Sequence, residues 1–433
     1  MTVPRNSLRG FLAQARAALR TAIDSNQKIT FVIGNESSDL DSMTCSILYA
    51  YIRSMVPPRN AFAPIYVPIN NIPASGIQLR PEFLELFKHA NIESRHLLTL
   101  DDLPELPVLK SKLPPENTKW ILVDHNALQG QLGKVYAERV GGVIDHHDEE
   151  GRVPKETGDE PRIVEKSGSC TSLVTNYLRC SWDVLSSLGM SSGAAYAQGG
   201  ALSGDSTVAK VWDAEAAQLG LASILIDTAN LQDNSKTTDH DRKAVEYLEA
   251  RILTCPKLAA SFDRTKFYEQ IDAARKDIGG MQLQNILQKD YKLWDDRGQK
   301  LGISSVVRNI DFLRKKAAEE AKAQSMDEAF LGALHGFATE RELDLYSVMT
   351  TSTSAEGQFQ RELLVWAFSE VGIAAAKKFA KDSHDELGLE EWQSEDGTAF
   401  DHTDDGYWRR VWWQRNVQHS RKRVAPLLRE AMT

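Results

Sequence analysis

Acidic and histidine side chains follow three short apolar segments of the chain. These segments are residues 29–33, 120–123 and 140–144, and the side chains after them are Asp39, Asp41, Asp124, Asp145, His146 and His147. Buried carboxylates that lie close together repel one another and are costly to remove from water. A pair of divalent cations would offset that cost, so the pattern predicts a two-metal centre. Mixed carboxylate and imidazole ligands suit Mn²⁺, Mg²⁺ or Co²⁺.

Two further observations bear on the ligand set. Asp227 follows the apolar residues 221–226, which could form a helix or a strand, so it is either a fourth ligand or a capping residue. Asp39 and Asp41, taken alone, could equally cap the helix expected after them. The four cysteines are widely scattered without a CxxC spacing, which argues against structural zinc and suits a reducing compartment.

The elements that must position these side chains alternate between strand and helix. Strands are expected at residues 29–33, 65–67, 120–123 and 140–144, and helices at 42–55 and 82–90. Such alternation predicts a mostly parallel, doubly wound sheet. Ligands of such sheets bind beyond the carboxyl ends of the strands, which is where the acids fall.

The second part of the chain has an α/β pattern of its own. A long charged helix is expected over residues 239–254, and the pair Cys255-Pro256 ends it. Two later strands are expected near residues 301–308 and 345–350. We therefore predict a first, larger domain and a smaller C-terminal α/β domain. Their predicted bounds are residues 1–258 and 262–433.

Length, charge and hydropathy exclude several classes of protein. The 433 residues suffice for two or three domains, and the net charge of −9 argues against a general nucleic-acid binder. No apolar run reaches the roughly 18 residues of a membrane span. The N-terminus lacks the apolar segment of a secretory signal. We expect a cytoplasmic monomer with no nucleic-acid or membrane partner.

The N-terminal segment allows two interpretations. It carries Arg5, Arg9, Arg16 and Arg20 and no acid before Asp24, a composition that a mitochondrial presequence shares. Its apolar residues at 8, 11, 12, 15 and 19 fall at helical spacing. We favour a first amphipathic helix of the domain, and a mitochondrial pool stays open.

The charge changes sign abruptly near the end of the chain. Residues 384–405 hold nine acids and residues 407–423 hold six Lys or Arg. The acidic stretch is expected to be a solvated loop. Aromatic residues in the basic stretch suggest nucleic-acid stacking or core packing. The helical spacing of Trp408 and Trp412 favours core packing.

Several of these segments resemble motifs of the DHH phosphoesterase superfamily. The run Asp145-His146-His147 is the superfamily's signature. The segments that resemble its exopolyphosphatase and prune branches are Gly34–Ser42, Glu160–Val164, Ser167–Val174 and Ile224–Asn230. In the second domain, Leu287–Lys292 and Ser420–Leu427 resemble motifs of the domain shared with family II inorganic pyrophosphatases. The resemblance spans roughly residues 28–430.

The resemblance implies a role for each site residue. It implies that the metal ligands are Asp39, Asp41, Asp124, His146 and Asp227, with Asp124 bridging two divalent ions. His147 would face the phosphate, and Asp145 would orient His146. The phosphate-binding residues of the second domain would be Lys292, Arg421 and Lys422. The active site would lie in the cleft between the two domains.

One position departs from the pyrophosphatase pattern. Asn35 stands where those enzymes carry a histidine metal ligand, whereas the exopolyphosphatase and prune branches have Asn. Asn35 is thus a possible ligand or a hydrogen-bond partner of the centre, and a turn residue otherwise. The superfamily's nucleases carry a GGGH motif, which does not occur here.

The resemblance implies an exopolyphosphatase that releases orthophosphate from the ends of inorganic polyphosphate. Two bridged divalent ions would lower the pKa of a shared water near neutral pH, and the resulting hydroxide would attack the terminal phosphorus. Two alternatives stay open. One is a hydrolase of pyrophosphate, tripolyphosphate or nucleoside polyphosphates, and the other is a prune-like regulatory protein without catalysis.

Overall fold

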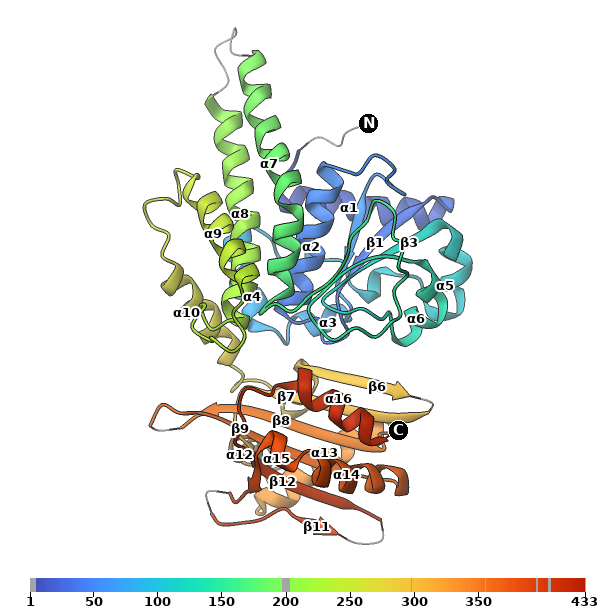
Figure 1. Cartoon of the computed structure of the whole chain (residues 1–433), viewed down its shortest axis with the longest axis vertical. Helices are drawn as coiled ribbons and strands as arrows, with labels where there is room; N and C mark the ends of the chain where they lie inside the picture. Colours follow the sequence, from blue (N-terminus) through green and yellow to red (C-terminus); the bar gives the residue numbers. More distant parts are fainter. Residues whose placement is uncertain are drawn as a thin grey trace. The chain divides into compact units, whose positions relative to one another are not determined.

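The computed structural model describes residues 5–196, 203–296, 298–354, 356–394, 396–403 and 406–432. The chain divides into two compact units, Met1–Arg275 and Lys276–Thr433 (Figure 1). Each unit combines helices with a sheet of its own, so the predicted pair of α/β domains is confirmed. None of the described helices has the length and apolar character needed to cross a bilayer.

Five parallel strands form the sheet of the first unit, in the order β2-β1-β3-β4-β5. Their bounds are β1 Ile29–Ile33, β2 Tyr66–Ile69, β3 Thr118–Val123, β4 Val140–Asp145 and β5 Arg162–Val164. Every side chain of β1 and β2 is buried, as strands covered on both faces require. The chain passes from β1 to β2 on one side and then to β3 on the other. The crevice outside the carboxyl ends of β1 and β3 is therefore where such a sheet binds ligands.

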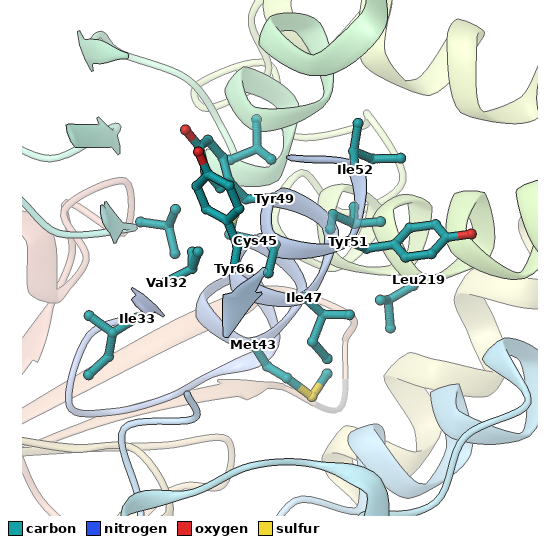
Figure 2. Packing of buried hydrophobic residues seen from close by; sticks show 14 of the residues in the cluster. Val32, Ile33, Met43, Cys45, Ile47, Tyr49, Tyr51, Ile52, Tyr66 and Leu219 are labelled. Carbon is teal, nitrogen blue, oxygen red and sulfur yellow. The ribbon is translucent and has the colours of Figure 1, made fainter. Parts of the chain in front are cut away.

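Ten α-helices are described in the first unit. They are α1 Leu8–Ser25, α2 Leu40–Met55, α3 Ala74–Ile77, α4 Pro81–Ala90, α5 Leu106–Lys112, α6 Gly130–Tyr136, α7 Cys170–Tyr196, α8 Ser203–Asp227, α9 Asp239–Leu253 and α10 Arg264–Lys276. Helix α2 is buried along its whole length because it packs against both the sheet and the long helices α7 and α8. In Figure 2, Tyr51 of α2 lies on the side of Leu219 of α8, whereas Tyr49 faces Tyr66 of β2.

Helix α1 confirms the predicted N-terminal amphipathic helix. Leu8, Phe11, Leu12, Ala15 and Leu19 are all buried in the core of the first unit. Arg9 and Arg20 are exposed on its outer face. The helix begins at a serine cap, Ser7, whose hydroxyl accepts a hydrogen bond from the backbone N–H of Gly10. This segment is therefore an integral part of the folded unit.

The second unit has a mixed sheet in the order β10-β12-β9-β8-β7-β6, with β11 paired to β12. The strands are β6 Tyr291–Asp296, β7 Gln299–Val306, β8 Leu345–Thr353, β9 Phe359–Ala367, β10 Leu389–Glu391, β11 His402–Thr403 and β12 Trp408–Gln414. The helices are α11 Leu283–Lys289, α12 Ile310–Ala321, α13 Met326–Glu340, α14 Glu370–Asp382, α15 His384–Leu387 and α16 Arg421–Met432. The expected strands near 301–308 and 345–350 correspond to β7 and β8, which pair in parallel.

Two expectations for the end of the chain are corrected. Trp408 and Trp412 lie on strand β12, not on a helix, although Trp408 does pack in a core as expected. A separation of four residues places side chains on one face of a strand as well as of a helix, so the spacing could not distinguish the two. The acidic stretch is not a plain loop, because it contains α15 and β10 and buries Trp392 and Phe400.

Candidate metal centre

The centre forms where β3 and β4 end. One ligand atom each of Asp124, His146 and His147 lie within 4.8 Å of one another. The Nε2 atom of His146 is 3.1 Å from Oδ1 of Asp124 and 3.8 Å from Oδ2 of Asp41. The Nδ1 atom of His147 is 3.8 Å from Oδ1 of Asp124. Parallel strands thus bring together side chains that are more than twenty positions apart.

Asp124 is held in an unusual backbone conformation. Its φ of +61° lies in the left-handed region, which Asp and Asn tolerate better than most residues. The amide nitrogen of Asn35 donates to its carboxylate Oδ2 at 2.7 Å and to its backbone oxygen at 3.1 Å. The Ser42 hydroxyl donates to the same Oδ2 at 2.7 Å. These contacts turn Oδ1 towards His146 and hold a conformation that costs about 1–3 kcal/mol when unsupported.

The loop after β1 packs closely on the start of α2. The Asn35 side-chain oxygen accepts hydrogen bonds from the backbone N–H and hydroxyl of Ser37, so its amide nitrogen points to Asp124. A Cβ atom on Gly34 would lie 2.6 Å from the Cβ of Ser42, so a side chain there would push the helix away. In this arrangement Asn35 acts as a hydrogen-bond donor to Asp124.

Asp39 caps helix α2, and a buried arginine supports the loop before it. The Asp39 carboxylate accepts a hydrogen bond from the Ser42 N–H at 3.0 Å and is partly exposed. Arg80 donates from Nε to the Ser38 carbonyl at 2.9 Å and from Nη2 to the Ser37 carbonyl. Ser38 has a φ of +42°, a strained value that these contacts sustain. Asp39 therefore has the capping role that the sequence left open.

Asp41 is buried and receives hydrogen bonds from segments distant in the sequence. Five of its donors are the Ser169 hydroxyl, the Cys170 N–H, the Thr171 N–H and hydroxyl, and the Ser223 hydroxyl, at 2.6–2.9 Å. All five are neutral groups. The Oδ2 atom of Asp41 remains 3.8 Å from Nε2 of His146.

The partner expected for Asp145 is corrected. Its Oδ1 lies 2.7 Å from Nδ1 of His147, whereas Nδ1 of His146 lies 3.0 Å from the carbonyl oxygen of Ser167. Burial alone would raise the pKa of the Asp145 carboxyl, but the adjacent His147 outweighs it and holds the pKa well below its usual range. Asp145 therefore orients His147, and a backbone carbonyl orients His146. Because His146 and His147 are adjacent in the sequence, the sequence could not show which of the two Asp145 orients.

Asp227 is the last residue of α8, which settles the choice between helix and strand. Ser223 precedes it by one helical turn, and residues four apart lie on the same face of a helix. The Ser223 hydroxyl donates to Asp41 at 2.9 Å. The face of α8 that carries Asp227 is thus the face that contacts Asp41.

Three supporting residues were not singled out by sequence reasoning. Asn126 donates from its amide to Asp145 at 2.6 Å and to the Asp148 carbonyl at 2.8 Å. Ser42 contacts Asp124, and Ser167 contacts His146, as described above. Ser42 and Ser167 lie within the quoted motifs, and Asn126 follows Asp124 by two residues. These three residues are polar and close in sequence to candidate ligands or to the motifs that contain them, and this was the only feature that could have identified them.

The predicted phosphate-binding residues of the second unit come from two motifs that meet in space. Arg421, the first residue of α16, lies 2.8 Å from the carboxylate of Asp290 and donates to its carbonyl at 2.9 Å. Burial would raise the pKa of Asp290, but Arg421 and Lys292 lower it below its usual value. Lys292 lies on β6 beside Asp290, and Lys422 is exposed beside Arg421. Sequence reasoning assigned no role to Asp290, the residue that holds Arg421 in place.

Comparisons with known proteins agree with the motifs. Residues 29–195 match the model of the DHH family, N-terminal domain, and residues 269–431 match that of the DHHA2 domain. The chain is 32% identical over 430 residues to the "Putative exopolyphosphatase" of Schizosaccharomyces pombe, covering 99% of this chain and 96% of that protein. The chain belongs to the DHH family.

Other DHH relatives extend this picture. The chain is 24% identical over 349 residues to the "Manganese-dependent inorganic pyrophosphatase" of Methanothrix thermoacetophila, covering 80% of this chain and 86% of that protein. Its fold is similar to a crystal structure of a Methanococcus jannaschii "putative family II inorganic pyrophosphatase". That match has a TM-score of 0.53 and 18% identity, and it covers 93% of this chain and 99% of the other.

The donor set of this DHH protein fits divalent metal ions. The carboxylates of Asp41 and Asp124 are 4% and 2% exposed, and the imidazole of His146 lies against both. A metal-bound imidazole usually donates its other ring N–H to a carbonyl or carboxylate. The contact between His146 Nδ1 and the Ser167 carbonyl is of that kind, and it turns Nε2 towards the carboxylates of Asp41 and Asp124.

Proposed function

We propose that this DHH protein is a metal-dependent exopolyphosphatase that hydrolyses the terminal phosphoanhydride bonds of inorganic polyphosphate. The product of each step is orthophosphate. The observation that carries the proposal is the convergence of Asp124, His146 and His147 at the carboxyl edge of the first sheet. The relative that matches nearly the whole chain, named an exopolyphosphatase, supports the choice of substrate.

In this proposal, two divalent ions are held by Asp39, Asp41, Asp124, His146 and Asp227. Asp124 would serve both ions, and Mn²⁺, Mg²⁺ and Co²⁺ all suit the ligand types. The pyrophosphatase relative is named for manganese, which supports this class of ion. When bound, such ions make a coordinated water acidic near neutral pH and neutralise phosphate charge.

The chain's own residues supply orientation and charge. The Asp145 carboxylate lies 2.7 Å from Nδ1 of His147 and fixes the orientation of the ring. In the imidazolium form of His147 both ring nitrogens are donors, and the second would donate to a phosphate oxygen. Arg421, fixed by Asp290, offers a planar fork of donors that matches two phosphate oxygens. Lys292 and Lys422 add positive charge for the leaving phosphate.

The test is phosphate release from long polyphosphate and from pyrophosphate, each with Mg²⁺, Mn²⁺ and Co²⁺. We expect release from long chains with at least one ion, loss of that release on chelation, and shortening from the chain ends by gel electrophoresis. The exposed-carboxylate variant Asp148→Asn is the control, because Asp148 pairs with Lys166 at the surface.

Other outcomes would contradict the proposal. Cleavage of pyrophosphate alone would identify a hydrolase of short substrates. Fragments cut within the chain would contradict terminal cleavage. No turnover of either substrate with any of the three ions would indicate a regulatory protein that has lost catalysis.

A further inference from the structure

A further buried aspartate contacts the segment that holds two of the candidate metal ligands. Asp241, in the first turn of α9, is fully buried and receives six hydrogen bonds. Its Oδ1 accepts from the hydroxyls of Ser167 and Ser172 and the N–H of Ser169, at 2.6–3.1 Å. Its Oδ2 accepts from the N–H of Gly168 and from the N–H and hydroxyl of Thr238, at 2.7–3.0 Å. Four of the six donors therefore belong to residues 167–172, which comprise the loop before α7 and the first turn of that helix and are called the loop 167–172 below.

The same loop contacts two candidate metal ligands with its other groups. The Ser167 carbonyl lies 3.0 Å from Nδ1 of His146. The Ser169 hydroxyl and the Cys170 N–H both donate to Asp41 at 2.7 Å. The loop thus has one side on Asp241 and the other on the centre. Its position decides where His146 and Asp41 point.

A purely local role accounts for only part of these contacts. Asp241 and Thr238 form a capping box at the start of α9, and that role needs only Oδ2. Oδ1 is occupied entirely by the loop. Burial would raise the pKa of Asp241, but hydrogen bonds led by those from Ser172 and Thr238 lower it, so the carboxylate stays ionised. An ionised acceptor makes stronger hydrogen bonds than a neutral one.

The close packing of the loop on Asp241 requires a glycine at position 168. A Cβ atom on Gly168 would lie 2.7 Å from the methyl group of Thr228 and 2.9 Å from Oδ2 of Asp241. Gly168 therefore lets the backbone approach the carboxylate directly. Any side chain at this position would move the loop away from Asp241 and carry Ser167 with it.

We infer that Asp241 is a positioning residue that sets the affinity of the centre for divalent metal, by fixing the loop 167–172 against His146 and Asp41. The inference rests on the metal centre of the proposed function. None of the six hydrogen bonds of Asp241 involves a candidate metal ligand. Groups that orient metal ligands typically change metal affinity 10–100-fold when they are removed. Asp241 acts one contact further out, through the loop.

The experiment is calorimetric titration of the full-length, metal-free protein with Mn²⁺. We expect Asp241→Asn to raise the dissociation constant by roughly 10–100-fold, because the amide loses one acceptor oxygen for the loop. Gly168→Ala should weaken Mn²⁺ binding in the same direction while leaving the Asp241 carboxylate in place. It also decides the matter if Asp241→Asn does not fold.

Two control variants separate positioning from stability. Thr238→Val removes the hydroxyl half of the capping box but keeps the contacts of Oδ1. Asp213→Asn disrupts a buried carboxylate on α8 that pairs with Arg5 at 2.6 Å and accepts from Trp182 at 2.9 Å. Both should lower the melting temperature of the metal-free protein and leave the Mn²⁺ dissociation constant within twofold of the parent.

The outcomes distinguish this inference from the proposed function. If the parent binds Mn²⁺ and both Asp241→Asn and Gly168→Ala bind it within twofold of the parent, the positioning role is wrong. The same holds if Thr238→Val or Asp213→Asn weakens binding as much as Asp241→Asn does. If the parent protein binds no Mn²⁺, Mg²⁺ or Co²⁺, the metal centre itself is wrong.

Discussion

The buried carboxylate of Glu160 and the buried carboxylates of the metal centre lie in the same unit, and their contacts differ in kind. Glu160 accepts hydrogen bonds from the hydroxyls of Tyr49 at 2.6 Å and Tyr66 at 2.5 Å, and it pairs with Arg53 at 3.1 Å. Burial, with the charge of Glu160, raises the pKa of both tyrosines, so their hydroxyls remain donors. The partners of this carboxylate are therefore the guanidinium of Arg53, which is always charged, and the hydroxyls of two tyrosines.

The carboxylates of the metal centre are contacted by other groups. Asp41 and Asp124 receive hydrogen bonds from hydroxyls and amides, and the imidazole of His146 lies against both. Neutral donors stabilise a carboxylate without cancelling its charge, whereas a guanidinium is always charged. The comparison indicates that a carboxylate paired with Arg53 builds the fold and that the carboxylates around His146 are arranged for a cation.

The largest effect is expected at Asp124. Asp124→Ala should reduce phosphate release from polyphosphate by at least roughly 10³-fold, about 4 kcal/mol, because this residue would serve both ions. Asp124→Asn tests the same point without strain, since Asn tolerates the φ of +61°. Initial rates at saturating Mn²⁺ give the measurement, with Asp148→Asn as the matched surface control. Activity of both Asp124 variants within tenfold of the parent would remove the distinction between the two groups.

The converse effect is expected at Glu160. Glu160→Gln leaves Arg53 buried without its partner, so the free energy of unfolding should fall by about 3 kcal/mol. Turnover per folded molecule should stay within twofold. Urea unfolding gives the measurement, and Glu149→Gln is the control, because Glu149 pairs with Arg162 at the surface and should change stability by less than about 1 kcal/mol. A loss of Mn²⁺ affinity in Glu160→Gln would contradict a purely structural role for Glu160.

The pair of Arg421 and Asp290 extends the comparison to the second unit. If Arg421 binds phosphate as proposed, Arg421→Ala should lower turnover roughly 10–100-fold, about 1.4–2.7 kcal/mol, and leave Mn²⁺ binding unchanged. Arg423→Ala is the matched control on the same helix, since Arg423 pairs with Glu386 at the surface. Unchanged turnover in Arg421→Ala together with lower stability would indicate that the pair of Arg421 and Asp290 is structural, as the pair of Arg53 and Glu160 is.

The smallest effect is expected at Asn35, which donates to Asp124. Imidazole binds Mn²⁺ and Co²⁺ relatively better than an amide does. Asn35→His should therefore tighten Mn²⁺ or Co²⁺ binding by roughly tenfold or less and raise pyrophosphate cleavage relative to polyphosphate cleavage. Metal titration of both activities in parent and variant gives the measurement. An unchanged affinity with an unchanged substrate ratio would leave Asn35 as a hydrogen-bond donor only.

The first four strands of the sheet, and the acids that follow three of them, could be predicted from the sequence. Apolar runs such as 29–33 and 120–123 are long enough for a strand and too short for most helices, and polar residues end them. Parallel strands then place Asp124 and His146 at one edge whatever the detailed packing. Periodicity was less reliable where two periods coincide, as with Trp408 and Trp412 on β12.

Only the tertiary structure decided how the candidate ligands are held. Five of the donors to Asp41 come from residues 169–171 and from Ser223, at least 128 positions away. Asp145 turned out to orient His147, and the loop fixed by Asp241 orients His146. Spacing along the chain determines which element a side chain belongs to and which face it occupies. Its hydrogen-bond partners depend on which distant segments pack against that face, because a hydrogen bond is made only within about 3 Å.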